Sequence, residues 1–425
     1  MVHWDVHTLQ PTLSEADVAV ICGDFPILAT EVNGRPLVYL DSGATSQKPE
    51  AVLDAEREFY VNRNSAVHRG AHTLAALATE EFEEARETVA RFVGANADEI
   101  VWTSNATEGV NLVAYALSNI RAGEPLALAP GDEIVVTELE HHANLIPWQQ
   151  LAQRTGATLK FIPVDDEGAL DLERAPITER THIVAFSHVS NVLGVVNPVA
   201  ELVARAHAVG ALVMLDACQS APHLPLDLHA LDVDFAVFSG HKMLAPTGIG
   251  VLYGRNRLLN ELPPFLTGGS MITTVTMESA SFLPAPQRFE AGTQRVSQAI
   301  ALAAAVDYLS GIGMERVAEH GARMSRQLLD GLSAIDGVRV LGAQGHERVG
   351  LASFAVEGIH SHDVGQFLDD RGIAVRVGHH CAQPLHRRLG LTSTTRASGS
   401  VYTTEAEIDF FLGAVADSRA FFGVA

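Results

Sequence analysis

The sequence predicts an α/β protein with a largely parallel sheet covered by helices on both faces, followed by a smaller α+β domain. From residue 99 to residue 254, apolar runs of strand length alternate with stretches of helical spacing. Near-continuous apolar strands are typical of parallel sheets buried on both faces. From about residue 290 the pattern changes to long helices and then to short strands, and 425 residues are too many for one ordinary core.

Eight apolar runs are expected to form strands before the change in pattern, at 35–40, 99–103, 133–137, 159–163, 182–187, 211–215, 234–239 and 251–253. Residues 14–30 are expected to form a short helix and a lead-in to the first strand. Helical spacing predicts further helices at 50–64, 79–93, 108–117, 147–154 and 199–209.

The C-terminal part is expected to combine helices with a few short strands. The spacing predicts long helices within 290–335 and further helices at 362–371 and 404–421. Short strands are expected at 338–342, 351–356 and 373–377. This pattern predicts a second domain of the α+β class.

Composition excludes several classes of function. The formal charge of −22 and the lack of a Lys/Arg run argue against a nucleic-acid partner. Three scattered cysteines, Cys22, Cys218 and Cys381, do not make a disulfide framework or a Cys-x-x-Cys metal site. The first residues lack a signal-peptide pattern, and no apolar run approaches membrane-spanning length. We therefore expect a cytoplasmic protein with no membrane and no nucleic acid as partner.

Polar groups follow the expected strands where each strand ends. In an open α/β sheet, ligands bind beyond the carboxyl ends of the strands. The groups at these ends are Ala106 and Thr107 at a helix start, His141, Asn191, Asp216 with Gln219, and the run Ser239-Gly-His-Lys242. A helix start suits a phosphate, and a buried acid needs a partner such as a pyridinium nitrogen. Alone, each group also fits an ordinary structural role.

Together these groups match the needs of pyridoxal 5′-phosphate (PLP). That cofactor requires a lysine for a Schiff base, an acid on its ring nitrogen and a phosphate site. Lys242 offers the amine, Asp216 the acid and the start of the helix near Thr107 the phosphate site. The sequence therefore predicts a PLP enzyme.

The motifs resemble those of SUF-type (group II) cysteine desulfurases, which are fold-type-I PLP enzymes of class V. The matching stretches are Tyr39-Leu-Asp-Ser-Gly-Ala-Thr-Ser-Gln-Lys-Pro, Ala66-Val-His-Arg-Gly-Ala-His-Thr-Leu, Ala106-Thr-Glu-Gly-Val-Asn, Glu140-His-His-Ala-Asn-Leu-Ile-Pro-Trp, His188-Val-Ser-Asn-Val-Leu-Gly, Asp216-Ala-Cys-Gln, Ser239-Gly-His-Lys, Phe289-Glu-Ala-Gly-Thr and Arg376-Val-Gly-His-His-Cys-Ala-Gln-Pro-Leu. They span nearly the whole chain. The resemblance implies a large domain over 31–294 with a mixed, mostly parallel seven-stranded sheet. It also implies a small domain over 295–425 and an N-terminal segment, 1–30, packed on it.

The resemblance also implies a role for each matching residue. Lys242 would bind PLP and shuttle protons, with His141 stacked on the ring. The other implied cofactor-binding residues are Ala106, Thr107, Asn191, Asp216, Gln219, Ser239 and His241, with Thr293 reaching in from the second subunit of a homodimer. The implied substrate-binding residues are Arg396 for the carboxylate of L-cysteine, with Asn191, His68 and Arg376. Cys381 would take the substrate sulfur as a persulfide, leaving alanine.

Cys381 also stands out on chemical grounds. A thiolate is the reactive form of cysteine, and neighbouring His379, His380 and Arg376 would make its loop electropositive. We interpret Cys218 as a packing residue and assign no role to Cys22. The sequence departs from the family pattern at Gln294-Arg295, which follows Thr293, and in the run Ala397-Ser-Gly-Ser-Val-Tyr.

The sequence leaves open which protein accepts the sulfur and which of several related activities the site performs. In the family the persulfide passes to an acceptor protein, and His362 resembles a histidine that ligates the zinc of a scaffold-like acceptor in the complex; the chain itself is expected to hold no metal. A surface histidine at a helix start is an equal reading of His362. The alternatives to a desulfurase serving iron–sulfur assembly are a selenocysteine lyase, another class V β-lyase, or a catalytically silent PLP-binding scaffold.

Overall fold

The computed structural model describes residues 12–342 and 345–424, and its largest element is a seven-stranded sheet in the order β4-β10-β9-β8-β7-β5-β6. The strands are β4 (Ile100–Thr103), β5 (Glu133–Thr137), β6 (Thr158–Ile162), β7 (Thr181–Ser187), β8 (Leu212–Asp216), β9 (Phe235–Ser239) and β10 (Gly250–Gly254). β10 runs antiparallel to β4 and β9, whereas the other neighbouring pairs are parallel. The predicted mixed, mostly parallel seven-stranded sheet is confirmed.

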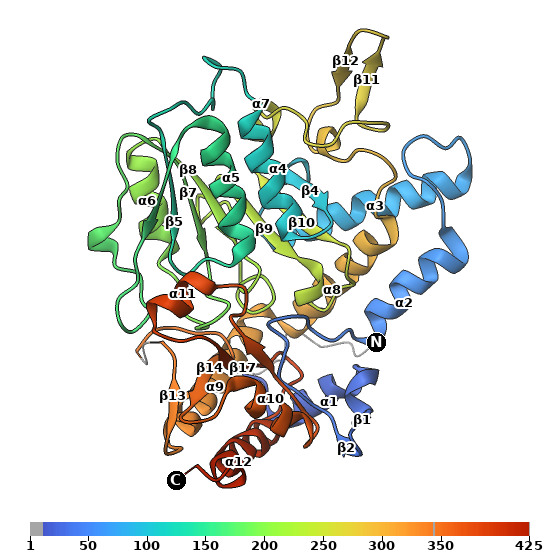
Figure 1. Cartoon of the computed structure of the whole chain (residues 1–425). Coiled ribbons are helices and arrows are strands. Elements are labelled where there is room, and N and C mark those ends of the chain that lie inside the picture. Colours follow the sequence, from blue (N-terminus) through green and yellow to red (C-terminus); the bar gives the residue numbers. More distant parts are fainter. Residues whose placement is uncertain (1–11, 343–344, 425) are drawn as a thin grey trace.

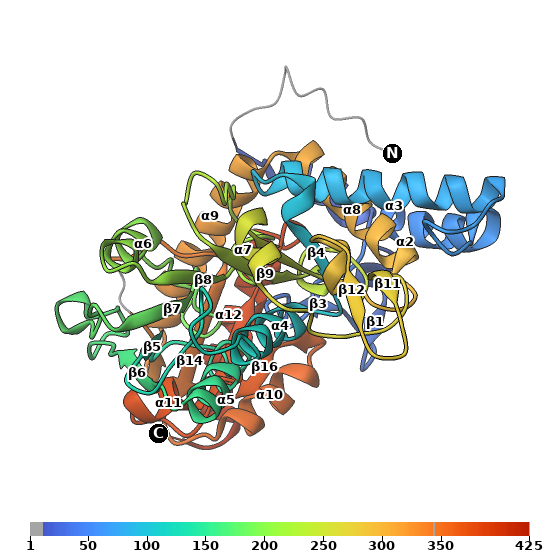
Figure 2. The ribbon, with the colours of Figure 1, turned by 90° about the horizontal axis from the view of Figure 1, so that it is seen from above.

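Helices cover both faces of this sheet because its strands are apolar on both sides. Val213 and Leu215 of β8 belong to one buried cluster, whereas Met214 between them belongs to another. Helices α4 and α5 cover one face and α3, α6 and α8 the other, and Figure 2 shows the sheet between these two layers. These helices are α3 (Thr73–Phe92), α4 (Ala106–Ser118), α5 (Ile146–Thr155), α6 (Val199–Ala208) and α8 (Val296–Ile312).

A four-stranded antiparallel sheet forms the centre of the C-terminal part, below the large sheet in Figure 1. Its strands, in sheet order, are β13 (Val338–Val340), β14 (Leu351–Val356), β17 (Thr394–Ser398) and β16 (Arg376–Gly378). Helices α9 (Met314–Ser333), α10 (Ser361–Asp369) and α12 (Glu405–Phe421) pack against it around Phe354 and Phe411. The expected α+β character of this part is confirmed.

The strand expected at 35–40 does not join the large sheet. It is divided into β2 (Arg35–Pro36), which pairs with β1 (Glu31–Val32), and β3 (Val38–Tyr39), which pairs in parallel with β15 (Ile373–Ala374). The reason is Pro36, which lacks an N–H and limits regular pairing. The division at residues 30/31 and 294/295 stays a prediction, and residues 1–11 of the N-terminal segment lie outside the described residues.

Several elements differ from the expectation. α3 begins at Thr73 rather than at residue 79, because His72 caps it by accepting the N–H of Ala75 at 3.2 Å. The expected strand at 373–377 is split into β15 and β16. The sequence patterns did not predict β17, the helices α7 (Asn256–Glu261) and α11 (Gln383–Arg388), or the hairpin of β11 (Ile272–Val275) and β12 (Ala280–Phe282). Strands β11 and β12 are short and largely exposed, so they show no apolar periodicity that would have predicted them.

The remaining helices are short or lie near the N-terminus: α1 (Glu15–Gly23), α2 (Glu50–Glu58), η1 (Pro26–Ala29), η2 (Phe59–Arg63), η3 (Ala97–Glu99), η4 (His142–Asn144), η5 (Leu172–Arg174), η6 (Gly240–Lys242) and η7 (Gln287–Phe289). Within the described residues no single helix is long and apolar enough to cross a membrane. The pair α8 and α9 passes that length and composition test only jointly and is bent by 78°.

Candidate active site

The carboxyl ends of the large sheet and the β16–β17 region of the small sheet enclose a cavity of about 250 Å³. Among the residues that line it are Ala106, Thr107, His141, Asn191, Asp216, Gln219, Ser239, His241, Lys242, Arg376, Cys381 and Arg396. The structure thus brings together every site residue predicted from the sequence except His68, Thr293 and the separately considered His362. These cavity residues lie far apart in the sequence, since 290 residues separate Ala106 from Arg396.

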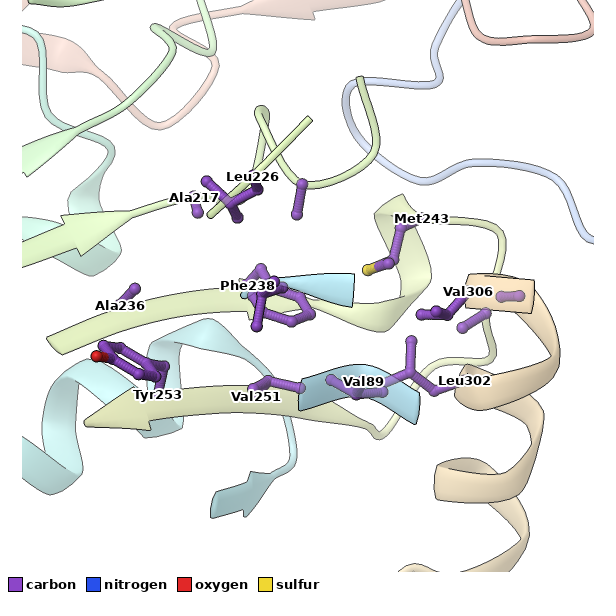
Figure 3. Packing of buried hydrophobic residues seen from close by; sticks show 14 of the residues in the cluster. Val89, Ala217, Leu226, Ala236, Phe238, Met243, Val251, Tyr253, Leu302 and Val306 are labelled. Carbon is purple, nitrogen blue, oxygen red and sulfur yellow. The ribbon is translucent and has the colours of Figure 1, made fainter. Parts of the chain in front are cut away.

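Lys242 lies on η6, directly after β9, on a firmly anchored turn. The N–H of Met243 donates to the carbonyl of Gly240 at 2.9 Å, and the Met243 side chain is fully buried. Figure 3 shows Met243 in the core near Val306 of α8. The half-buried amine of Lys242 has no carboxylate within salt-bridge distance among the described residues. It is therefore held in place while its amine remains available for a ligand.

Asp216, the last residue of β8, is a buried carboxylate that meets the backbone N–H and the thiol of Cys218. Its Oδ1 accepts the N–H of Cys218 at 2.9 Å. Burying a charged group is costly unless it is paired, and Asp216 is only 7% exposed. A cationic or N–H-bearing ligand in the cavity would satisfy it.

The start of α4 forms an anion site beside these residues. Ser239 accepts the N–H of Ala106 at 2.9 Å, which ties the helix start to the end of β9. β10 can approach only because residue 250 is glycine: a Cβ on Gly250 would lie 2.5 Å from the Cα of Asn105. The free N–H groups and the positive dipole end of a helix favour a phosphate at this place, and Thr107 lies there.

His141 presents a neutral imidazole to the cavity. Its Nδ1 accepts the N–H of Ala143 at 3.1 Å, so this nitrogen carries no proton. Burial and the nearby charge of Lys242 lower the pKa of His141 to about 4. His241, next to Lys242, is held neutral in the same way, because burial lowers its pKa to about 4.

Arg396 lies in β17 and is paired in register with Arg376 of β16. It is 2% exposed, and its Nη1 donates to the carbonyl of Asn191 at 2.8 Å, while Nη2 lies 3.3 Å from the carboxylate of Asp41. Arg376 also pairs with Asp41, at 3.5 Å. Burial lowers the pKa of Arg396 to about 10, so it remains charged at neutral pH. Two guanidinium groups thus share one carboxylate at the cavity wall.

Cys381 is exposed and lies on a strained turn that lines the same cavity as this arginine pair. His380 and Cys381 have φ angles of 50° and 57°, in the left-handed region that non-glycine residues rarely adopt. Asn191 Nδ2 donates to the carbonyl of His380 at 2.6 Å, and the N–H of His142 donates to the carbonyl of Cys381 at 2.7 Å. The strain is therefore held by two hydrogen bonds, as is common at functional sites.

The expected electropositive surroundings of Cys381 are only partly present. His380 is buried, and desolvation lowers its pKa to about 2, so it carries no charge. The positive charge at this end of the cavity comes instead from Arg396 and Arg376. The expectation that His380 contributes positive charge is wrong, because the sequence did not reveal its burial.

His68 and Thr293 do not line the cavity of this chain. His68 has a φ of 72°, and its Nε2 lies 2.8 Å from the carboxylate of Glu83 on α3. Glu83 thus holds the imidazole at the outer helix of this chain, and the role of His68 in the substrate pocket stays a prediction. Thr293 is exposed, and its role in a second subunit stays a prediction.

Three further residues named in the sequence analysis are Cys218, Cys22 and His362. Cys218 is buried and also lines the cavity, and burial raises the pKa of its thiol. Cys22 Sγ donates to the carbonyl of Tyr402 at 2.8 Å, and burial raises its pKa to about 12. His362 lies exposed at the start of α10, with its ring stacked on His360 at a centroid distance of 5.9 Å. Within 12–342 and 345–424 no group of three or more metal-ligating side chains occurs.

Sequence reasoning missed Asp41, His142 and Glu140 as parts of the site. Glu140 is fully buried and accepts hydrogen bonds from Ser187 Oγ and Asn144 Nδ2, both at 2.7 Å, which joins the loop after β5 to the end of β7. Asp41 and Glu140 stand inside motifs quoted above, but acids in loops give no sign of the partners they meet in the fold. His142 contacts the loop of Cys381 through its backbone N–H and its imidazole, and the sequence gives no sign of these contacts.

The residues of the cavity fit PLP. The amine of Lys242, which has no carboxylate partner among the described residues, suits the aldehyde of PLP. The buried carboxylate of Asp216 suits its ring nitrogen. The start of α4, together with Ser239, suits its phosphate. The neutral ring of His141 and the side chain of Gln219, whose Nε2 donates to the carbonyl of Gly43 at 2.8 Å, complete the wall.

Comparison with known proteins agrees with this fit. The aminotransferase class-V family matches residues 38–411. The probable cysteine desulfurase 2 of Mycobacterium leprae is 58% identical over 414 residues, 97% of this chain and 99% of that protein. The solved cysteine desulfurase CsdA of Escherichia coli is 38% identical, with a TM-score of 0.86 over 95% of this chain and 98% of that one.

A more distant solved relative is the cystine C–S lyase C-DES. It is 27% identical, with a TM-score of 0.78 over 92% of this chain and 99% of that one. A lysine-to-alanine variant of C-DES has glycine covalently linked to its PLP cofactor. The fold, the PLP-fitting cavity and these matches together show that this chain belongs to the aminotransferase class-V family, within its group of PLP-dependent cysteine desulfurases.

Proposed function

We propose that the protein is a cysteine desulfurase that converts L-cysteine to L-alanine and carries the sulfur on Cys381 as a persulfide. One observation supports this most directly: Lys242, Asp216, Arg396 and the exposed Cys381 all line a single cavity. An enzyme that only rearranges bonds at Cα has no need of a thiol in this position.

PLP, when bound, supplies an electron sink for the bonds at the Cα of the substrate. Lys242 would hold it, Asp216 would pair with its ring nitrogen, and Ser239, His241 and the start of α4 would bind its phosphate. Lys242 lines the cavity and would also serve as the proton carrier for the substrate Cα. The neutral ring of His141 provides a flat, uncharged surface for stacking.

Arg396 binds the carboxylate of L-cysteine. A guanidinium group offers two parallel N–H donors to a carboxylate, and its geometry makes this contact orienting as well as attractive. Its own position is fixed by the carbonyl of Asn191 at 2.8 Å. Asn191 also holds the loop of Cys381 through the carbonyl of His380 at 2.6 Å. One residue thus sets the distance between the carboxylate clamp and the nucleophile.

Cys381 then takes the sulfur. Its thiolate attacks the substrate sulfur, an S–S bond forms, and the Cβ–S bond breaks with its electron pair remaining on Cβ. The sulfur is oxidised from the thiol to the sulfane level, and Cβ is reduced as it takes up a proton. The products are alanine and the Cys381 persulfide, so no external oxidant is needed.

The test is alanine release from L-cysteine by the PLP-loaded enzyme, compared with Cys381→Ala. We expect Cys381→Ala to lose the activity, because no acceptor takes the sulfur. Cys22→Ala, which changes a thiol packed against Tyr402 outside the cavity, is the matched control and should retain it. Full activity of Cys381→Ala would exclude the persulfide route.

A C–S lyase is the second candidate, because C-DES shares the fold at 27% identity. A lyase eliminates its leaving group and releases pyruvate, whereas a desulfurase releases alanine. Selenocysteine lyase activity at the same site is a separate alternative, because removal of selenium from L-selenocysteine leaves alanine as the desulfurase reaction does. Pyruvate as the main product, undiminished in Cys381→Ala, would favour the lyase over the desulfurase.

We further infer a homodimer in which Thr293 of one subunit completes the PLP phosphate site of the other. The exposure of Thr293 outside its own cavity supports this reading. Mixing Lys242→Ala with Thr293→Ala chains should restore part of the activity, since one of the two sites then has both residues intact. A monomer in solution with tight PLP binding would contradict the proposal.

A SUF-type role in iron–sulfur assembly, in the cytoplasm, is proposed on the sequence motifs. The acceptor of the persulfide would be a zinc-containing, scaffold-like protein, with exposed His362 taking over one zinc ligand in the complex. His362→Ala should then lower acceptor-stimulated turnover while basal turnover stays unchanged, with neighbouring His360→Ala as the control. Equal stimulation of His362→Ala and wild type would remove this role.

A further inference from the structure

A hydrogen-bonded chain of three side chains leads from α11 to the cavity. His386 Nδ1 lies 3.0 Å from the carbonyl of Ala382, and His386 Nε2 lies 3.0 Å from the hydroxyl of Thr394. The same hydroxyl lies 2.9 Å from His380 Nε2. All three side chains are buried, and His380 lines the cavity beside Cys381.

The chemistry of these partners fixes every proton in the chain. A carbonyl only accepts, so His386 Nδ1 carries the proton. Burial lowers the pKa of His386, so its ring is neutral and its Nε2 accepts from Thr394. A hydroxyl has one proton, so towards His380 the Thr394 oxygen accepts, and His380 Nε2 is the protonated nitrogen. Because His380 is also neutral, its Nδ1 has a free lone pair.

That lone pair has no partner within the described residues. His380 Nδ1 is a buried polar atom with no hydrogen bond, and the ring is 5% exposed. An unsatisfied buried acceptor is costly, about 1–3 kcal/mol, so such an atom calls for an explanation such as a ligand donor. His380 lines the cavity and directly precedes Cys381, so a substrate whose sulfur reaches the Cys381 thiol brings its S–H group towards this wall.

We propose that Thr394 and His386 position His380 as an acceptor for the S–H group of the substrate, and that this selects L-cysteine over substrates without such a donor. The inference rests on the proposed function. An S-alkylated cysteine or a disulfide brings no proton to this end of the cavity. A selenol is ionised at neutral pH, and a selenolate would meet the lone pair of His380 instead of donating to it.

The charged groups near His380 do not change this assignment. Arg396 of β17 and Arg376 of β16 both lower the pKa of His380, as does His386 of α11, although burial is the largest cause. The backbone of Thr394 acts in the opposite direction, but burial and the neighbouring charges outweigh it, so the ring stays an acceptor across the neutral range.

The first test reads the tautomer directly. Histidine labelled with ¹⁵N in the full-length protein, with the His380 signals assigned by loss in His380→Gln, should show a protonated Nε2 and an unprotonated Nδ1. This measurement requires no turnover, so it remains informative if the proposed function fails. A protonated Nδ1 in the wild-type protein would overturn the proposal.

The second test is the ratio of kcat/KM for L-cysteine to that for L-selenocysteine, with alanine as the product. Thr394→Val removes the hydroxyl at nearly constant side-chain volume, so His380 can then adopt either neutral tautomer. We expect it to lower the ratio by about tenfold, the effect of one hydrogen bond, whereas Thr394→Ser should keep it. Thr395→Val, a change at the neighbouring buried residue whose hydroxyl lies 3.4 Å from the carbonyl of Ser361, is the control. An equal ratio in Thr394→Val and Thr394→Ser would contradict the proposal.

Discussion

The N–H of His142 donates a hydrogen bond of 2.7 Å to the carbonyl oxygen of Cys381. This contact joins the loop after β5, which carries His141, to the loop of the nucleophile in the C-terminal part. A second contact runs the other way, from the N–H of Gln383 to His142 Nε2 at 3.2 Å. The loop of the thiol is thus tied to the large sheet by the backbone N–H and the imidazole of His142.

Gly250 should be essential for the anion site. In Gly250→Ala, the new Cβ would lie 2.5 Å from the backbone of Asn105, so β10 and the start of α4 must separate. We expect weaker PLP binding, measured by equilibrium dialysis of the cofactor. Gly311→Ala in α8, where a Cβ would meet nothing within 4 Å, is the control and should bind PLP normally. Equal PLP affinity in both variants would show that the close approach of β10 is unimportant.

Asn191→Ala should loosen the nucleophile loop. The left-handed turn at His380 and Cys381 costs on the order of 1–3 kcal/mol per residue, and Asn191 Nδ2 is one of the groups that hold it. We expect faster alkylation of Cys381 by iodoacetamide and at least tenfold slower alanine release. Unchanged alkylation would mean that His142 alone is sufficient to hold the turn.

Arg295 should stabilise the segment that carries Thr293. Its Nη2 donates to Ser104 Oγ at 2.5 Å and lies 3.4 Å from the carboxylate of Glu108, at the start of α4. Arg295→Ala should therefore speed the loss of PLP from the holoenzyme, followed by absorbance after dilution. Arg295→Lys, which retains the charge, should have a smaller effect. If Arg295→Ala released PLP at the wild-type rate, Arg295 would have no role in stabilising the segment of Thr293.

Acid should destabilise the fold through its buried histidines. Burial lowers the pKa of His223 and of His320 to about 4 each, below the unfolded value of 6.5. The unfolded state therefore binds more protons between these values, and stability falls as the pH drops from 6.5 towards 4.

Each such histidine accounts for about 2 kcal/mol between pH 7.5 and pH 5. Urea unfolding of His223→Gln at pH 7.5 and pH 5 should show a smaller loss than wild type by about that amount. Exposed His360→Gln should behave as wild type. A loss as large in His223→Gln as in wild type would assign the acid sensitivity to other groups.

Much of the large domain could be predicted because its strands are short apolar runs followed by chemically distinctive residues. Lys242, Asp216 and Cys381 were found from sequence because their chemistry is rare at such positions, and their motifs match a known family. The contact of His68 with Glu83 could not be predicted, because Glu83 lies on a helix that the motif does not include. The neutrality of His380 and the roles of Asp41 and His142 depend on burial and backbone contacts formed only in the fold.

The central claim is that sulfur moves from L-cysteine to Cys381. The PLP-loaded enzyme is given L-cysteine labelled at sulfur for a single turnover, with no acceptor present. The Cys381 peptide is then analysed by mass spectrometry. We predict that this peptide gains one labelled sulfur atom in the same proportion as alanine is formed, while the peptides of Cys22 and Cys218 gain none. Stoichiometric alanine formation with an unmodified Cys381 peptide would contradict the account.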